Sequence, residues 1–443
     1  MRLLKPPYLP AHFPIPLIYY NDVFILRCYM DNMLDTGTLK VSLRSTLGSI
    51  PIKSAQVAIS YTGEPDSTIE TLSTDSSGQT ETITLPTPPL EYSMSPSENQ
   101  PYSEYTLQIN AEGYEPVSVS GVELFSGQEA LADIDMVPNT AGKNPERFVI
   151  GPHTLFGDYP PKIPEEEVKP PTESGEIVLS RVVVPEYIIV HDGPPSDSSA
   201  SDYFVPFTDY IKNVASSEIY ATWPASTIRA NVLAILSFTL NRVYTEWYRN
   251  KGYDFTITSS TAYDHKWIPG RNYFESISII VDELFTNYLS RPNVKQPILT
   301  QYCDGKQVQC LDRGWMTQWG SKYLGDQGYS PIEIIRYYYG NNMYINTAEQ
   351  ISGIPASYPG YDLTIGSSGS KVLQLQKQLN RIAQVYTNIP TVAEDGIYGN
   401  DTARAVSAFQ RIFDLPISGV TDFPTWYAIS RIYVAVTRIG ELY

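Results

Sequence analysis

Residues 209–248 carry the clearest hydrophobic pattern in the chain, and the pattern is helical. Apolar side chains recur at offsets of three and four, which places them on one helix face: Ile211, Val214, Ala215 and Ile219. Trp223-Pro224 then interrupts the pattern, and proline is favoured at the first position of a new helix. The following stretch, 226–248, is apolar around too much of its circumference for a surface helix. The pattern therefore predicts one amphipathic helix, a break, and a long buried helix at the core of a domain.

Residues 36–137 alternate with a period of two, which predicts an all-β region. Short runs of alternating apolar and polar residues are separated by turns rich in Gly, Pro, Ser and Asp. The runs are LKVSLRS, QVAISYT, TETITLP, YTLQINAEGY and PVSVSGVEL. Asp75–Gly78 has the composition of a hairpin turn before the third run. Nothing catalytic stands out in this region, so we expect a folded accessory domain or pro-domain.

Two segments are expected to lack regular structure. Prolines interrupt any continuous helix in residues 1–35, and no run reaches the roughly 18 apolar residues of a membrane span. We therefore expect 1–35 to be a leader, poorly ordered or processed, without a signal peptide of ordinary form. Residues 138–180 are rich in proline and acidic residues and have no period. That composition predicts an extended, accessible linker of the kind that proteases cut.

The remaining two regions combine helices and strands differently. Residues 181–357 alternate strand-like runs, such as RVVVPEYIIVHDG, with helix-like runs, such as ESISIIVDELFTNYL, which predicts an α+β domain. Residues 358–443 show helical periods instead. The apolar positions that share a face there are Val372, Leu375 and Leu379, then Ala405, Val406 and Phe409. The chain is therefore expected to be multidomain, with all-β, α+β and helical parts in that order.

Charge and histidine content exclude several functions. The net charge of −17 and the isoelectric point near 4.7 argue against nucleic acid or an anionic membrane surface as a partner. The histidines are His12, His153, His191 and His265, and the first two lie outside the central region. A zinc amidase needs histidine ligands and a Ser-His-Asp hydrolase needs an oriented histidine base. Neither constellation has a recognisable motif in this chain.

Glu218 is the candidate for acid catalysis. It lies at the end of the first predicted helix, beside apolar Ile219, Tyr220 and Trp223. A carboxylate among apolar neighbours tends to have a raised pKa, which suits a general acid. Spacing alone favours the simpler interpretation, a solvated glutamate at a helix end.

The sequence around Glu218 resembles that of a known protein family. The stretch VASSEIYATWPASTIRAN resembles the signature of the SpoIID/LytB family of peptidoglycan lytic transglycosylases, whose single catalytic glutamate matches Glu218. A second family motif is similar to GWMTQWGSKYLGDQGYSPIEIIRYYYG at residues 314–340. Two separated matches in the right order are a specific signal. The chain departs from the family at Arg313, where a histidine is expected, and at Trp319, where tyrosine is frequent.

The resemblance also implies substrate-binding residues. The stretches ITSSTAYD and QYCDGKQVQC fall where the family has strands and loops lining its cleft. The candidates for substrate binding are Ser260, Thr261, Tyr302, Asp304, Gln318 and Trp319.

Cys303 and Cys310 raise the question of a metal. With His265 and a carboxylate they could just supply the four ligands of a structural zinc, as some relatives have. Their spacing matches no standard zinc pattern, so a disulfide or two free thiols is favoured over zinc. No cofactor is expected.

The C-terminal and N-terminal regions carry further resemblances. Residues 363–382 and 395–429 resemble the three-helix peptidoglycan-binding repeat found on many wall hydrolases, with Asp395 and Tyr398 as candidate contacts. The runs between residues 51 and 124 look like a transthyretin-like β-sandwich. The order of the parts is similar to that of clostridial spore cortex-lytic enzymes of the SleC type. That resemblance implies an extracytoplasmic enzyme of the spore cortex or cell wall, stored as a zymogen and activated during germination by a serine protease that cuts near the linker.

Together these observations predict a lytic transglycosylase that cleaves between N-acetylmuramic acid and N-acetylglucosamine and leaves 1,6-anhydromuramic acid. Two alternatives remain open at this point. One is a hydrolytic muramidase or an N-acetylmuramoyl-L-alanine amidase. The other is a non-catalytic peptidoglycan-binding or enhancer protein.

Overall fold

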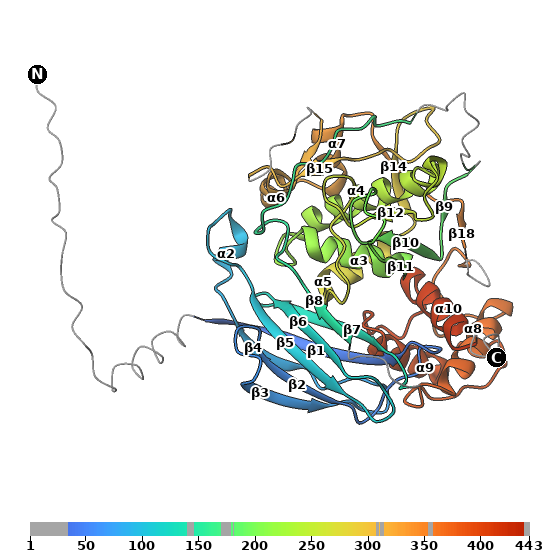
Figure 1. The fold of residues 1–443 in the computed structure, drawn as a ribbon. Coiled ribbons are helices and arrows are strands. Elements are labelled where there is room, and N and C mark those ends of the chain that lie inside the picture. The colour runs from blue at the N-terminus through green and yellow to red at the C-terminus, as the bar shows by residue number, and fades with distance from the viewer. Residues whose placement is uncertain are drawn as a thin grey trace, which may run out of the picture. The chain divides into compact units, whose positions relative to one another are not determined.

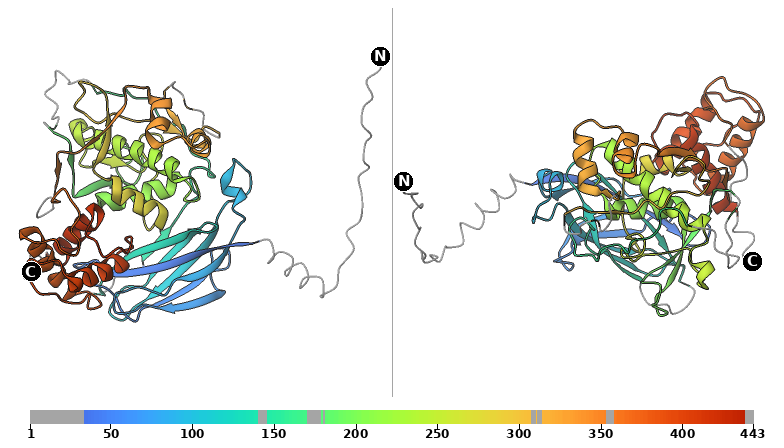
Figure 2. Two further views of the ribbon diagram at one scale, coloured as in Figure 1. Left: turned by 180° about the vertical axis from the view of Figure 1, so that it is seen from behind. Right: turned by 90° about the horizontal axis from the view of Figure 1, so that it is seen from above.

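The computed structural model describes residues 34–139, 146–169, 179, 181–306, 310, 314–352 and 358–437. All the elements below belong to one compact unit, Asp35–Tyr443 (Figures 1 and 2). The expected leader lies outside the described residues up to position 33, and so does the departure from the family at Arg313.

The N-terminal region is built from two sheets that share one apolar core. One sheet has the order β3 (Thr68–Ser73), β2 (Gln56–Tyr61), β5 (Ser103–Asn110), β6 (Val117–Leu124) and β8 (Glu146–Val149). The other has the order β13 (Tyr273–Phe274), β7 (Glu129–Met136), β1 (Asp35–Ser45) and β4 (Ile83–Thr87), and a short helix α2 (Glu91–Met94) follows β4. Alternate residues of β1 are fully buried: Leu39, Val41 and Leu43. The period of two thus marks the inward side of these strands.

The central region is organised around a buried helix, α4 (Ala225–Tyr244). Nearly every α4 residue from Thr227 onwards is buried, as its all-round apolar character predicts. Helices α3 (Phe207–Glu218), α5 (Glu275–Leu284), α6 (Gln318–Asp326) and α7 (Pro331–Tyr339) all contact it. The break between α3 and α4 falls where Trp223-Pro224 predicts it.

Short strands complete the central region. They form small sheets rather than one large one: β11 (Asp202–Pro206), β10 (Tyr187–His191) and β12 (Ile257–Thr258); β14 (Asn287–Ser290) with β17 (Tyr344–Thr347); β15 (Tyr302–Cys303) with β16 (Met316–Thr317); and β9 (Val183–Val184) with β18 (Gln350–Ile351). A 3-10 turn, η1 (Arg249–Lys251), follows α4. The mixture of helices and strands agrees with the expected fold class at this coarse level.

The C-terminal region contains the helices α8 (Ser370–Ala383), α9 (Asn400–Ile412) and α10 (Phe423–Thr437). Their predicted apolar faces meet in a separate core that includes Leu375, Leu379, Phe409 and Trp426. This core is distinct from the larger one shared by the β region and the central region.

The structure differs from the accessible linker expected over 138–180. Residues 146–149 form β8, which pairs in parallel with β6, and Ile150, His153 and Leu155 are buried. Lys162 and Lys169 are also buried, although both carry charges. Composition suggested an exposed segment because it counts charges without their partners. Here Lys162 donates to the backbone oxygen of Asp264 in the central region, and Lys169 pairs with Glu165 of its own segment. The rest of the expected linker, 140–145 and most of 170–180, lies outside the described residues.

A buried ion pair joins the β region to the central region. Arg271, just before β13, donates to the Glu123 carboxylate of β6 over 2.6 Å and also to the backbone oxygen of Ser216 in α3. Both side chains are almost completely buried. Strand β13 continues the contact by pairing with the edge of β7, and the ring of Phe274 packs 5.2 Å from that of Phe125. The β region is therefore attached to the central region by a sheet edge and a buried charge pair as well as by the chain.

This ion pair generates the first prediction. Arg271→Leu leaves Glu123 buried without its cation, so the free energy of unfolding should fall by about 3–5 kcal/mol. Glu123→Leu should cost a comparable amount. The double variant should lose less than the sum of the two, because neither charge is then left uncompensated. Denaturant unfolding of the four proteins measures the coupling, and strictly additive losses would show that the two side chains do not stabilise each other.

Candidate functional site

Glu218 is the last residue of α3, and its side chain points into the protein. Its side chain is 4% exposed. Carboxylate Oε1 accepts the backbone N–H of Lys266 over 2.7 Å. Oε2 accepts from the side-chain amide of Gln318 over 3.2 Å, and the same amide donates to the backbone oxygen of Glu218 over 2.9 Å. Residues 218, 266 and 318 thus converge from three separate parts of the sequence, and the solvated glutamate favoured by spacing alone is not what the structure shows.

The pKa of Glu218 reflects two opposing effects. Burial raises the pKa of its carboxyl above the ordinary value, because the charged form loses its hydration. The ammonium group of Lys162 acts in the other direction, and so do hydrogen bonds from the Lys266 backbone and the Gln318 side chain. A carboxyl that keeps its proton to higher pH, and still has partners for its charged form, can both donate and accept a proton.

Aromatic side chains and a histidine lie beside the carboxyl. Tyr302 is buried next to Glu218, and both burial and that carboxylate raise the pKa of its hydroxyl well above the ordinary range. The ring of His265 stacks on Tyr302 with centroids 5.9 Å apart, and its Nδ1 lies 3.1 Å from the hydroxyl of Tyr210. Burial holds the pKa of His265 well below its ordinary value, so the imidazole is neutral.

The segment 159–169 contributes a cation that sequence analysis did not single out. Lys162 is 6% exposed, and its ammonium group donates to the backbone oxygen of Asp264. The ammonium nitrogen also lies 4.8 Å from the centre of the Tyr302 ring, within cation–π distance. No short motif marks this lysine, because its partners belong to distant parts of the chain. Its position between prolines in an acidic stretch made it look solvent-exposed.

Ion pairs fix the same segment in place. Glu165 makes two hydrogen bonds, of 2.6 and 3.0 Å, to the guanidinium of Arg242 in α4. Asp264 accepts from Nε of that guanidinium over 2.7 Å, and both Arg242 and Asp264 are fully buried. Because Arg242 would otherwise be an unpaired buried charge, the segment is a structural part of the central region.

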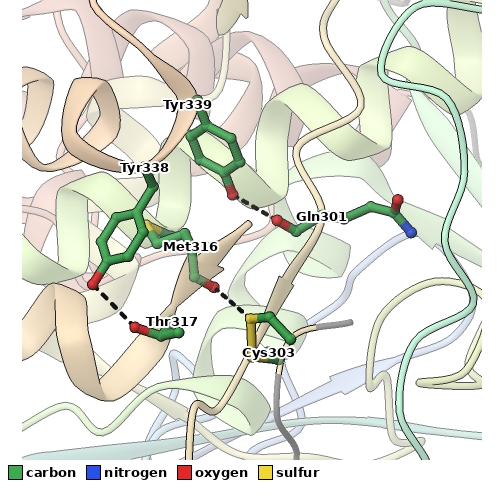
Figure 3. The surroundings of a disulfide bond; sticks show 7 residues. Gln301, Cys303, Met316, Thr317, Tyr338 and Tyr339 are labelled. Carbon is green, nitrogen blue, oxygen red and sulfur yellow. Dashed lines mark hydrogen bonds between the residues drawn. A yellow bond between two sulfur atoms is a disulfide. The ribbon is translucent and has the colours of Figure 1, made fainter. Parts of the chain in front are cut away.

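A disulfide lies next to the same group of residues. Cys303 and Cys310 are bonded, so the structure bears out the favoured alternative over zinc on these two sulfurs. Cys303 follows Tyr302 in β15, which pairs in parallel with β16, and Figure 3 shows Cys303 close to Met316 and Thr317 of that strand. Neighbouring hydrogen bonds join Thr317 to Tyr338 over 3.0 Å and Tyr339 to the backbone oxygen of Gln301 over 2.9 Å. The disulfide therefore ties β15 to Cys310, within the connection between Tyr302 and Gln318.

The other expected substrate contacts lie at varying depths. Ser260 and Thr261 are half-buried in the turn before Asp264, and the backbone oxygen of Ser260 accepts the N–H of Asp264 over 2.8 Å. Asp304 is buried, and its backbone oxygen accepts the N–H of Trp319. The half-buried ring of Trp319 packs against Trp223 with centroids 5.0 Å apart. Gln318, Tyr302 and Trp319 are thus grouped around the end of α3, whereas Ser260 and Thr261 lie on the side of the 159–169 segment.

In the C-terminal region the two residues expected to contact peptidoglycan, Asp395 and Tyr398, differ in exposure. Asp395 is exposed, and its carboxylate accepts the N–H of Ile397 over 2.8 Å and the side-chain amide of Gln376 over 2.9 Å. Tyr398 is fully buried, and its hydroxyl donates to the backbone oxygen of Gly419. In this structure Tyr398 is a core residue of the helical region, a role that the apolar period alone did not distinguish from surface contact.

Comparison with known proteins bears on one part of the chain. A family model described as a putative peptidoglycan binding domain matches residues 368–429, which span α8, α9 and the start of α10. No curated protein matches the chain. Among the described residues, every helix is too short or too polar to cross a membrane. The C-terminal region is therefore a peptidoglycan-binding domain by its match, and it associates the protein with the cell wall.

The disulfide generates the second prediction. In denaturant, the oxidised chain should show one reactive thiol, from Cys28, and three after reduction, because the sequence has three cysteines. Replacing both Cys303 and Cys310 by serine should lower the free energy of unfolding by about 2 kcal/mol, the loop-closure value for a ring of this size. Thermal unfolding with and without reductant measures the effect. Three reactive thiols before reduction would contradict the disulfide.

Proposed function

We propose that the protein is a peptidoglycan lytic transglycosylase in which Glu218 is the catalytic acid and base. The observation that carries this proposal is the buried Glu218 carboxyl, held at a helix end by Lys266 and Gln318 and raised in pKa by its burial. The resemblance of residues 214–231 and 314–340 to the SpoIID/LytB motifs supports it, because those two stretches supply Glu218 and Gln318.

The mechanism needs one carboxyl and no water. Protonated Glu218 donates its proton to the oxygen that links N-acetylmuramic acid to N-acetylglucosamine, and the bond from that oxygen to C1 of the muramic residue breaks. The C6 hydroxyl of the same muramic residue attacks the oxocarbenium-like C1 and forms the 1,6-anhydro bond. The Glu218 carboxylate accepts the proton that this hydroxyl releases, so the enzyme returns to its starting state. The nucleophile is already part of the substrate, and the reaction gains from this proximity.

The surroundings of Glu218 support a single-carboxyl mechanism. Hydrolytic glycosidases use a second carboxyl about 5–10 Å away as nucleophile or base. The groups that chiefly set the pKa of Glu218 are Lys162, Lys266, Tyr302 and Gln318, and none is a carboxylate. Asp264, a buried carboxylate in the same region, is occupied by Arg242, Tyr248 and Thr258.

The setting proposed for this activity is the spore cortex during germination. Cell-wall association follows from the peptidoglycan-binding domain. The proposal of the spore cortex in particular is based on the order of the domains, which resembles that of SleC-type enzymes. The disulfide suits an extracytoplasmic location, because disulfides persist in oxidising compartments.

We also propose that the β region keeps the enzyme latent until a serine protease cuts the chain. Helix α2 of the β region lies against the aromatic residues next to the site. The indole N–H of Trp223 donates to the backbone oxygen of Ser93 over 3.0 Å, and Thr222 donates to the Ser93 hydroxyl over 2.8 Å. Trp223 in turn packs on Trp319, the neighbour of Gln318. A glycan strand reaching Glu218 from this side would have to displace α2.

One observation favours a second candidate, a non-catalytic peptidoglycan-binding protein. The Glu218 carboxylate is 4% exposed, and both of its oxygens already accept hydrogen bonds from the protein. A carboxylate that never opens to a glycan would have a structural role, and the C-terminal domain would then account for the whole function.

The third prediction separates these functions. Glu218→Gln keeps the shape of the side chain but removes the transferable proton, so formation of anhydro-muropeptides should fall by about two to four orders of magnitude. Mass spectrometry of digested cortex peptidoglycan measures the products. Reducing ends would instead identify a muramidase, free stem peptides an amidase, and unchanged glycan a binder.

The matched control is Glu275→Gln, which changes an exposed carboxylate at the start of α5. It should keep full activity. Sedimentation with insoluble peptidoglycan should be unchanged in both variants, because binding is assigned to residues 368–429. Wild-type rates in Glu218→Gln would remove Glu218 from the catalytic role.

The fourth prediction concerns latency. A specific protease site placed between Asn139 and Glu146 allows the full chain to be cut once, with 159–169 left on the central region. Cutting should raise the specific activity, because the β region then no longer acts at the high effective concentration of a tethered partner. The Arg271–Glu123 pair should slow its release, so the cut protein carrying Glu123→Gln should activate faster.

The control is the same full chain incubated with inactivated protease. Size-exclusion chromatography reports whether the β region has left. Equal specific activity before and after release of the β region would contradict the zymogen and leave the region as a folding or targeting module.

A further inference from the structure

Lys162 is a buried charge that the proposed reaction does not yet use. Its ammonium group is enclosed by the backbone oxygen of Asp264 and by the rings of Phe238 and Tyr302, at 5.5 and 4.8 Å from the nitrogen. Lysine is rarely buried to this extent unless its charge is compensated. Lys169, the other buried lysine of this segment, forms a salt bridge with Glu165, so its charge is compensated. The carboxylates with the largest charge interaction with Lys162 are Glu218 and then Asp264, and Asp264 is already paired with Arg242.

We propose that Lys162 is a positioning residue of the Glu218 site, whose buried ammonium stabilises the carboxylate that Glu218 becomes when it gives up its proton. The inference rests on the proposed function for its role in catalysis. For its effect on Glu218 it rests on the contacts that both side chains make with residues 264–266: the Lys162 ammonium donates to the backbone oxygen of Asp264, and the N–H of Lys266 donates to the Glu218 carboxylate. The ring of Tyr302 lies 4.8 Å from the ammonium nitrogen, and the Glu218 carboxylate contributes to the raised pKa of the Tyr302 hydroxyl.

The chemistry requires such a group. A carboxyl that is only buried holds its proton too firmly, because ionisation would create an unsolvated charge. Two backbone or amide N–H groups, from Lys266 and Gln318, stabilise the ionised form in part. Burial lowers the pKa of the Lys162 ammonium, and the Glu218 carboxylate raises it again, so each charge favours the other. A buried cation adds a field that does not need to reorganise when the proton leaves, which is the form of electrostatic assistance that enzymes use most.

The segment that carries Lys162 is fixed firmly enough for this role. Glu165 is bonded to Arg242, the N–H of Ile163 donates to the backbone oxygen of Ala262, and the Gln301 side chain donates to the backbone oxygen of Ile163. Glu167 forms a two-bonded ion pair with Arg291. Contacts of the residues that directly follow Lys162 thus fix the backbone against Ala262, Gln301, Arg242 and Arg291.

Other titratable groups also face Glu218, and the test has to separate them from Lys162. They are Tyr159 of the same segment, Tyr210 of α3, Lys266 and Tyr302. The three tyrosines stay protonated through the working range, because burial raises the pKa of each. Lys266 is half-buried and its ammonium nitrogen lies 5.0 Å from the centre of the Tyr159 ring, so it contributes a second positive charge on the outer side.

The experiment compares the full chain with Lys162→Gln, which can still donate to the Asp264 backbone oxygen but has no charge, and with Lys162→Arg, which keeps the charge. Lys169→Gln is the matched control, a buried lysine of the same segment that is paired with Glu165 instead. The Glu218 carboxyl is followed by ¹³C NMR titration of glutamate-labelled protein and assigned with Glu218→Gln. Lys162→Met replaces Lys162→Gln if the latter does not fold.

Loss of the cation should move the Glu218 titration to higher pH by about 1 unit or more, the usual effect of one close charge. The alkaline limb of the pH–rate profile should move in the same direction, and the maximal rate of anhydro-muropeptide formation should fall by about tenfold or more. Lys162→Arg should restore both towards the wild type, and Lys169→Gln should change neither.

The outcomes distinguish this inference from the proposed function. An unchanged Glu218 titration in Lys162→Gln overturns the inference. A faster reaction in that variant also overturns it, because Lys162 would then hinder catalysis instead of assisting it. A shifted titration in a protein that forms no anhydro-muropeptides keeps the electrostatic pairing and rejects the transglycosylase.

Discussion

A buried guanidinium holds the central region together. Arg242 lies in the last turn of the buried helix α4 and has no access to water. It is tolerated because Glu165 and Asp264 approach it from sequence positions on either side of α4. Desolvated charges of this kind add little stability over an apolar replacement, but losing one partner is costly. The pair of carboxylates therefore fixes the path of two loops, and those loops carry Lys162 and Lys266 to the end of α3.

How far the sequence predicts this structure depends on the range of the interactions involved. The helix, break and buried helix of 207–244 follow from local periodicity, because each side chain's environment repeats with the turn of the helix. Strands β1, β2, β4, β5 and β6 follow from alternation for the same reason, whereas β3 and β7 are not among the predicted runs. The environment of Glu218 could not be predicted in this way, since Lys266 and Gln318 are 48 and 100 residues away in the chain. The resemblance to the family motif singles out Glu218 as a catalytic candidate. Its hydrogen-bond partners are known only from the three-dimensional structure.

The 146–169 segment shows the opposite case, in which a compositional rule predicts the wrong environment. Proline and acidic residues predict an exposed linker because such residues usually cannot bury enough apolar surface. In this chain Glu165 and Glu167 pair with arginines of the central region, and Lys169 pairs with Glu165. An average over the segment cannot detect this, because it depends on which individual residues meet an opposite charge.

The route of this segment also bears on how such a chain can be assembled from parts. Its first residues, Glu146–Val149, complete a sheet of the β region. Near its other end, Glu165 accepts hydrogen bonds from the buried Arg242 of the central region. The two regions therefore overlap in sequence instead of meeting at a boundary. If the N-terminal part were exchanged by recombination at residue 181, the new part would bring its own sheet. Arg242 would then lose Glu165, one of its two carboxylate partners. Modules of this chain can be inherited separately only where the crossover lies before the shared segment, or where the incoming part carries an equivalent one.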